Sequence, residues 1–288
     1  MNRKAIDQQP IRAIGLVVIE VVNSNANGDP DRESDPRQRP DGKGEISSVS
    51  FKRKLRDLVE EKDGPVWKSL CDELGLKGES HAILESRGRD RKLIVKEVND
   101  GTFREKYWDG RVFGNTFLEK GASDFIRTGA VQFALGVSIA PIAIERMTNT
   151  NKAGVEGDTD RGMAPLGYRI VPHGVYTMPF FVNPSAAVKS GCTKCDVDLL
   201  YRLIPQAYVH TASYVRPSVG IRHAWVVEHK SPLGSCSDFD LLDALRPRIK
   251  DGLDPTKPST SWADYDVPRY LPPALRERVA SFRDLVDA

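Results

Sequence analysis

A chain of 288 residues, of which 40% are hydrophobic and 28% charged, has an ordinary globular composition and is long enough for one large domain. Its 42 Lys and Arg residues nearly balance 40 Asp and Glu residues, so the net charge of +2 excludes a uniformly basic, histone-like protein but not a local basic groove. The sequence has no apolar run of membrane-spanning length, no signal-peptide core near its start and only four cysteines, which predicts a cytoplasmic protein with reduced thiols and no membrane association.

The first element that the sequence predicts is a buried strand over Ile11–Val22, a run rich in β-branched residues. A long polar segment follows at residues 23–44, and its Asn, Asp, Gly and Pro residues favour a loop. A helix is then expected to begin at Ser47 or Ser48, because either serine can act as its N-cap. The core-facing stripe of this helix has helical spacing and consists of Phe51, Leu55, Leu58 and Val59.

Positive charge is concentrated where this loop meets this helix. Residues 32–56 hold eight Lys and Arg residues against four acids, a local excess of four in a protein whose total is +2. Lys52 and Arg56 are four residues apart and share one helix face, while Arg53 lies about 100° further round. Clustered cations beside exposed loop amides are what phosphate groups require, so we interpret the region as a phosphate-binding surface. A solvated, charged helix face is the alternative.

The remaining elements alternate irregularly, which predicts an α+β fold: one domain over residues 1–288, with a helical insertion at about 61–110. The pattern predicts helices at 66–74, 197–207, 238–249 and 272–286, and strands at 112–118, 131–144, 169–182 and 220–229. A polar segment with four glycines, residues 147–167, separates two of these strands. Its Gly, Asn, Thr and Asp residues cannot bury a core, so we expect it to project from the body of the protein.

Motifs for metal binding are weak. Asn23, Asn25 and Asn27, followed by Gly28, match the front of an EF-hand calcium loop, but the twelfth position is Ser34 where a bidentate Glu is required. Two cysteines form a C-T-K-C pair at 192 and 195, but a structural zinc site needs two further ligands, and no second pair or H-x₃₋₅-H motif exists. We therefore expect neither a metal nor a cofactor.

Motifs for catalysis are weak as well. Asp29, Asp31 or Asp35 could hold a metal or activate a ribose hydroxyl, but Asn, Asp and Gly residues in a loop more often just turn the chain. The sequence contains no P-loop, no G-x-S-x-G motif and no G-x-G-x-x-G motif. These absences favour a binding or assembly role over an enzyme.

Four blocks in the same order resemble a known family. They are NSNANGDPD at 23–31, SSVSFKRKLRD at 47–57, YWDGRVFG at 107–114 and GAVQFALGVSIAPI at 129–142. Together they resemble the backbone subunit of type I CRISPR Cascade complexes, the "Cas-seven" family of the RAMP superfamily, closest to its I-B and I-C branches. The resemblance implies a modified RRM-like (ferredoxin-like) core with a thumb hairpin at about 147–168. It also implies a non-catalytic subunit that polymerises head to tail along a CRISPR RNA, beside other Cascade subunits, and presents this RNA to a target DNA strand.

The resemblance gives the candidate residues their expected roles. Lys52, Arg53 and Arg56 would contact guide phosphates, and Asn23, Asn25 and Gly28 would lie on the RNA path. In the thumb, Met147 and Met163 would wedge beside a displaced base while Arg161 and Arg169 hold the flanking phosphates. Two alternatives remain open: a type III-like backbone subunit that cleaves target RNA through a loop Asp, and a free-standing single-strand-binding protein without a guide.

Overall fold

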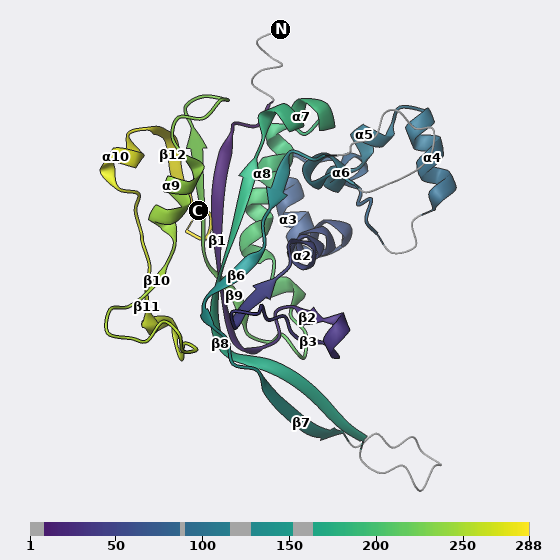
Figure 1. Cartoon of the computed structure of the whole chain (residues 1–288). Helices are drawn as coiled ribbons and strands as arrows, with labels where there is room; N and C mark the ends of the chain where they lie inside the picture. Colours follow the sequence, from purple (N-terminus) through teal and green to yellow (C-terminus); the bar gives the residue numbers. More distant parts are fainter. Residues whose placement is uncertain (1–8, 87–89, 116–127, 152–163, 288) are drawn as a thin grey trace, which may run out of the picture.

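The centre of the protein is an antiparallel sheet with the strand order β12-β9-β1-β8-β6-β4 (Figure 1). The structure is a computed structural model that describes residues 9–86, 90–115, 128–151 and 164–287. Two further strands, β5 and β7, pair with β8 off this path. The strands are β1 (Ala13–Ser24), β4 (Lys43–Ile46), β5 (Val131–Phe133), β6 (Gly136–Pro141), β7 (Glu145–Asn151), β8 (Ala164–Val182), β9 (Val219–His229) and β12 (Val279–Asp284). The expected α+β class is thus confirmed as a mixed fold built on a large antiparallel sheet.

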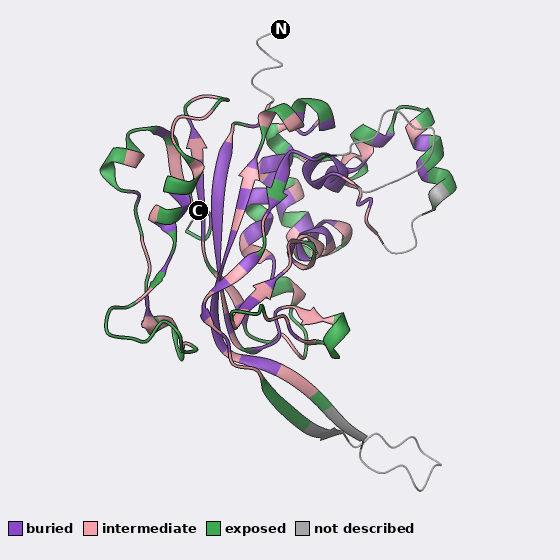
Figure 2. Ribbon diagram, viewed as in Figure 1, coloured by how far each residue is buried: buried purple, intermediate pink, exposed green. Residues whose placement is uncertain are grey.

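Strand β1 lies between β8 and β9 and is buried on both faces, which explains its nearly continuous apolar sequence. Val17, Ile19 and Val21 belong to a core cluster on one face of the sheet. Leu16 and Val18 belong to a second cluster on the other face, together with residues of the C-terminal segment. Figure 2 shows this strand buried along most of its length.

Two helices pack on the first face of the sheet. Helix α2 (Ser48–Glu60) begins after the N-cap Ser47, whose hydroxyl accepts from the backbone N–H of Ser50, and its predicted stripe is buried. Helix α8 (Lys194–Leu203) begins with a capping box between Thr193 and Asp196. Helices α3 (Pro65–Leu74) and α7 (Pro184–Ser190) border the same cluster, while α9 (Asp238–Leu245) covers the opposite face.

The predicted strand at 112–118 is wrong over its described part, because α6 (Trp108–Phe113) is a helix. Its buried Asp109 pairs with Arg56 at 2.8 Å and accepts from the backbone N–H groups of Leu84 and Glu85. Its Arg111 makes a two-pronged contact with Asp196 at 2.7 and 3.0 Å. These distant partners fix the helix. It completes a helical segment with α4 (Arg91–Asn99) and α5 (Phe103–Lys106).

The predicted terminal helix at 272–286 is also wrong. Only a short helix forms there, α10 (Pro273–Arg276), and β12 follows it. Strand β12 pairs with the edge of β9, and the Asp284 carboxylate accepts from the backbone N–H of Ala224 at 2.9 Å. The predicted helix at 238–249 ends earlier, at Leu245, before Pro247, and the predicted strand at 131–144 is divided into β5 and β6.

The polar segment between these strands forms a two-stranded ribbon that extends away from the sheet (Figure 1). Strand β8 is a single strand of 19 residues that runs from the middle of the sheet into this ribbon, where β7 pairs with it. Residues 152–163 lie outside the described part of the chain, and with them the predicted thumb residues Arg161 and Met163.

Candidate nucleic-acid interface

The polar loop after β1 is folded back on itself and fixed to helix α2. A short ladder joins β2 (Gly28–Asp29) to β3 (Asp35–Pro36). The Asn27 side-chain oxygen accepts from the backbone N–H of Ser47, the N-cap of α2, at 2.8 Å. The loop is therefore a packed tab whose position relative to α2 is set.

The three loop residues predicted to lie on an RNA path have different environments. Asn23 is exposed, with a left-handed φ of 44°. Asn25 is buried and donates from its side-chain nitrogen to the Ser34 carbonyl at 2.8 Å. A Cβ on Gly28 would meet the same Ser34 carbonyl oxygen at 3.0 Å, so internal packing already explains this glycine. Asn25 and Asn27 both use their side chains inside the protein, which argues against the calcium-loop interpretation.

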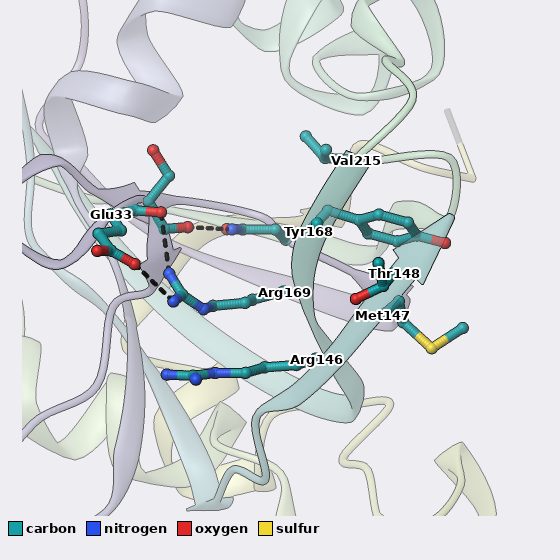
Figure 3. A pocket seen from close by; sticks show the side chains of 10 residues that line it. Glu33, Arg146, Met147, Thr148, Tyr168, Arg169 and Val215 are labelled. Carbon is teal, nitrogen blue, oxygen red and sulfur yellow. Dashed lines mark hydrogen bonds and ion pairs between the residues drawn. The ribbon is translucent and has the colours of Figure 1, made fainter. Parts of the chain in front are cut away.

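A cavity of about 400 Å³ lies where this loop meets the ribbon (Figure 3). We call it the ribbon pocket. Side chains from the loop, from both strands of the ribbon and from the segment before β9 line it. The lining residues are Asn25, Glu33, Ser34, Arg146, Met147, Thr148, Gly167, Tyr168, Arg169 and Val215.

Two arginines dominate the charge of the ribbon pocket. Arg169 forms ion pairs with Glu33 and Asp35, both at 2.7 Å, and also donates to the Glu33 carbonyl at 3.1 Å. The hydrogen bond from Arg169, with its positive charge, lowers the pKa of the Glu33 carboxyl group, and Arg146 adds to this effect. Within the described ranges, Arg146 forms no ion pair of its own, and Figure 3 shows it alongside Arg169. The pocket therefore offers one cation that is free for a ligand.

Aromatic and thioether side chains adjoin these cations. Met147 is 41% exposed and lies opposite Tyr168 in the β7–β8 ladder. The Tyr168 ring meets the ring of Tyr214 edge-on, with centroids 5.3 Å apart. Sequence reasoning identified Met147 and Arg169 but missed Arg146, Tyr168 and Tyr214. The strand alternation could have suggested them, but the pairing register could not be known from the sequence.

A second cavity of about 400 Å³ lies beside helix α2, and we call it the α2 pocket. Its lining includes Lys52, Arg56 and Phe113. Both cations lie over the Phe113 ring, Lys52 at 5.5 Å and Arg56 at 5.2 Å from the ring centroid. Burial lowers the pKa of Lys52, and the positive charge of Arg56 lowers it further. Among the residues that the structure describes, Lys52 forms no ion pair, so it could be neutralised by an anion in this pocket.

The other two predicted cations of α2 are already neutralised inside the protein. Arg53 forms ion pairs with Asp57 at 2.7 Å and Glu60 at 2.6 Å. Arg56 is buried against Asp109, as described above. We therefore revise the prediction for α2: Lys52 remains a candidate for phosphate contact, whereas Arg53 and Arg56 stabilise the fold. Sequence reasoning gave no role to Lys54, whose pKa is lowered by burial and by the nearby Arg216.

The loop carboxylates do not form a metal site. Asp29 caps a short 3₁₀ helix by accepting from the N–H of Asp31, and Asp35 pairs with Arg169. In the described part of the chain, no group of three or more His, Cys, Asp or Glu side chains is placed to hold a metal ion. The described helices also include none that is long and apolar enough to span a membrane.

Comparison with known proteins now identifies the family. The family model for CRISPR-associated protein Cas7 matches residues 12–269, which is most of the chain. The protein therefore belongs to the Cas7 family, which confirms the resemblance seen in the sequence; its assignment to the I-B or I-C branch remains a prediction. No curated protein matches the sequence.

Several solved structures are similar in fold. One chain of a "CRISPR RNA-guided surveillance complex, pre-nicking" is 16% identical, with a TM-score of 0.46, and the match covers 75% of this chain and 78% of that one. A chain of another CRISPR RNA-guided surveillance complex is 18% identical, with a TM-score of 0.41 and coverages of 83% and 77%. A chain of the type III-B Cmr-beta complex bound to cognate target RNA is 14% identical, with a TM-score of 0.39 and coverages of 76% and 61%. The family assignment depends on the sequence match alone.

Proposed function

We propose that this protein is the guide-RNA-binding backbone subunit of a type I CRISPR effector complex, Cascade. Several copies would assemble head to tail along one CRISPR RNA in the cytoplasm, together with other Cascade subunits. The assembled guide would then pair with a target DNA strand in antiviral defence. The observation that carries this proposal is the match to the Cas7 family over residues 12–269.

The two pockets support RNA binding through the sugar-phosphate backbone. Arg146 and Lys52 are cations without an internal ion pair among the described residues, and each lines a cavity of about 400 Å³. Phosphate contacts fix the position of a nucleic acid without reading its sequence, which suits a subunit that must accept any guide. Stacking on Tyr168 or Tyr214 would be equally independent of sequence, because every base has an aromatic face.

The order of the strands supports the finer fold assignment. Along the chain, β1, α2, β6, β8, α8 and β9 follow each other as βαββαβ, and in the sheet the strands lie in the order β9-β1-β8-β6. This is the connectivity expected of a modified RRM-like, ferredoxin-like core. The β7–β8 ribbon would be the thumb, and the helices between α2 and β5 would be an insertion.

We further propose that the subunit is not an enzyme. Two of the three loop carboxylates proposed for catalysis, Asp29 and Asp35, are occupied as a helix cap and as an ion-pair partner of Arg169. Asp31 is exposed and is the remaining candidate. A type III-like subunit would cleave bound target RNA with a divalent metal, and Asp29→Ala or Asp31→Ala would abolish the cleavage. We expect no cleavage by the wild-type protein.

The decisive experiment is to identify the RNA that copurifies with the protein from cells that carry a CRISPR array and the other Cascade genes. The proposal predicts RNA of defined length with uniform ends derived from the repeat. RNA of random sequence and length would contradict the guide-binding role and favour a free-standing single-strand-binding protein.

A further inference from the structure

We propose that Glu33 is an internal anion that occupies the phosphate-binding end of Arg169 in the free subunit and is displaced by RNA. This inference rests on the proposed function, because it describes how the ribbon pocket opens for a polyanionic ligand. It makes Glu33 a residue that sets the affinity of the pocket although it would repel the ligand.

The argument starts from how Arg169 divides its donors. Its Nε faces Asp35 at 2.7 Å, while its two terminal nitrogens face Glu33. One terminal nitrogen donates to the Glu33 carboxylate at 2.7 Å and the other to the Glu33 carbonyl at 3.1 Å. The paired terminal N–H groups of a guanidinium are those that bind phosphate in a bidentate manner. Glu33 thus covers the part of Arg169 that a phosphate would use, while Asp35 would keep the guanidinium oriented after Glu33 left.

The position of Glu33 makes this displacement inexpensive. Its side chain is 84% exposed, so moving it uncovers little apolar surface. Exposed ion pairs contribute little stability and are screened by salt. Glu33 and Ser34 have left-handed φ angles of 50° and 65°, which non-glycine residues seldom adopt. A strained, exposed turn is a suitable place for a contact that must break.

The neighbouring charges explain why a polyanion would be needed. Arg146 lies directly across the ladder from Arg169, and both arginines lower the pKa of the Glu33 carboxyl group. A ligand with one phosphate must compete with a carboxylate that is part of the protein itself. An RNA chain reaches Arg146 and other sites at once, so its local phosphate concentration is high and it can displace Glu33.

The test compares Glu33→Gln with Asp31→Asn in the full-length protein, using fluorescence anisotropy with an unstructured single-stranded oligouridylate. Both variants remove one negative charge from the same exposed loop, but Asp31 forms no contact with Arg169. We expect Glu33→Gln to bind about two- to fivefold more tightly than wild type, which corresponds to the free energy of an exposed ion pair. Asp31→Asn should change the affinity by less than half of that factor.

A third variant isolates the contact. In the background of Arg169→Ala, the change Glu33→Gln should no longer improve binding, as a double-mutant cycle requires of two residues that act through each other. Equal gains from Glu33→Gln and Asp31→Asn, or no gain from Glu33→Gln, would overturn the proposal while leaving RNA binding intact. If the wild-type protein and all variants fail to bind RNA, the proposed function fails with it.

Discussion

Arg146 and Arg169 are direct partners across the β7–β8 ladder, and they differ in how their charges are compensated. Two carboxylates hold Arg169, whereas Arg146 has no ion-pair partner among the described residues. Like charges at opposed positions of a ladder destabilise a sheet, so this pairing carries a cost that a bound anion would remove. The ribbon root is therefore organised for a ligand more than for stability.

The first prediction concerns Arg146. Arg146→Ala should weaken the binding of single-stranded RNA and reduce the slope of log K against log salt by about 0.7, the value for one lost phosphate contact on a single strand. The melting temperature should not fall, because the side chain is exposed. Arg202→Ala is a matched control, since Arg202 is a surface arginine paired with Glu73. An unchanged salt slope would show that Arg146 does not contact phosphate.

The second prediction separates two adjacent cations of α2. Lys52→Ala should weaken RNA binding and reduce the salt slope by a similar amount, because Lys52 faces the α2 pocket without a carboxylate partner in the described part of the chain. Arg53→Ala should leave the affinity within about twofold of wild type, because Asp57 and Glu60 already neutralise this arginine. A larger loss of RNA binding in Arg53→Ala than in Lys52→Ala would reverse our revised assignment.

The third prediction concerns the buried ion pair between Arg56 and Asp109. Asp109→Ala would leave the Arg56 guanidinium without its carboxylate partner and free two backbone N–H groups, so we expect a loss of about 3–5 kcal/mol in the free energy of unfolding, measured by urea denaturation. Asp198→Ala, which breaks an exposed pair with Lys194, should cost less than about 1 kcal/mol. Equal losses would contradict a structural role for the buried pair.

The fourth prediction is a pH dependence that arises from Lys62. Burial lowers the pKa of its ammonium group from 10.5 to about 8, so the unfolded chain binds this proton more tightly than the folded protein does. The free energy of unfolding contributed by this group should therefore fall as the pH drops from about 10.5 to about 8, and should stay constant below that. In Lys62→Met this dependence should disappear.

Equilibrium urea denaturation of wild type and Lys62→Met between pH 7 and about 10 would measure the difference. Burial raises the pKa values of Tyr176, Tyr201 and Tyr208, but this contribution cancels in the comparison because both proteins contain these tyrosines. Lys68→Met is the control, since Lys68 is an exposed lysine near the same turn. Parallel pH curves for wild type and Lys62→Met would contradict the lowered pKa.

The fifth prediction tests the ribbon as a thumb. Replacement of residues 149–165 by a short Gly/Ser linker should leave the denaturation midpoint unchanged, because the core clusters contain none of these residues. Assembly on guide RNA, followed by size-exclusion chromatography and nuclease footprinting, should fail because the clamp between neighbouring copies is lost. Assembly with an unchanged footprint would remove the thumb from the proposal.

The elements predicted well were those with local signals. Helix α2 has its N-cap at Ser47 and its apolar stripe within one short segment, so its start and its buried face followed from the sequence. Helix α6 did not, because its apolar and aromatic residues also suit a strand, and the buried partners that hold it as a helix are Arg56 and Asp196, which are distant in sequence. Strand β12 likewise depends on the free edge of β9.

The same distinction applies to the candidate site. The cluster of positive charge was visible in the sequence, but not which cations the fold would neutralise. Asp57 lies four residues after Arg53, a local signal for an ion pair that could have been used. The partner of Arg56 is 53 residues away. The position of Arg146 opposite Arg169 required the register of the ribbon, which composition and periodicity do not determine.

The continuity of β8 gives the ribbon the mechanics of a lever. One strand of 19 residues, roughly 60 Å if fully extended, carries both the ribbon and the middle of the sheet, so a sideways load on the ribbon is delivered as torque to the ladder with β1. The β1 ladder ends at Val171, and Pro172 and Gly174 follow at once. Proline cannot donate to a ladder and glycine has no side chain to pack, so elastic bending would concentrate at this fulcrum.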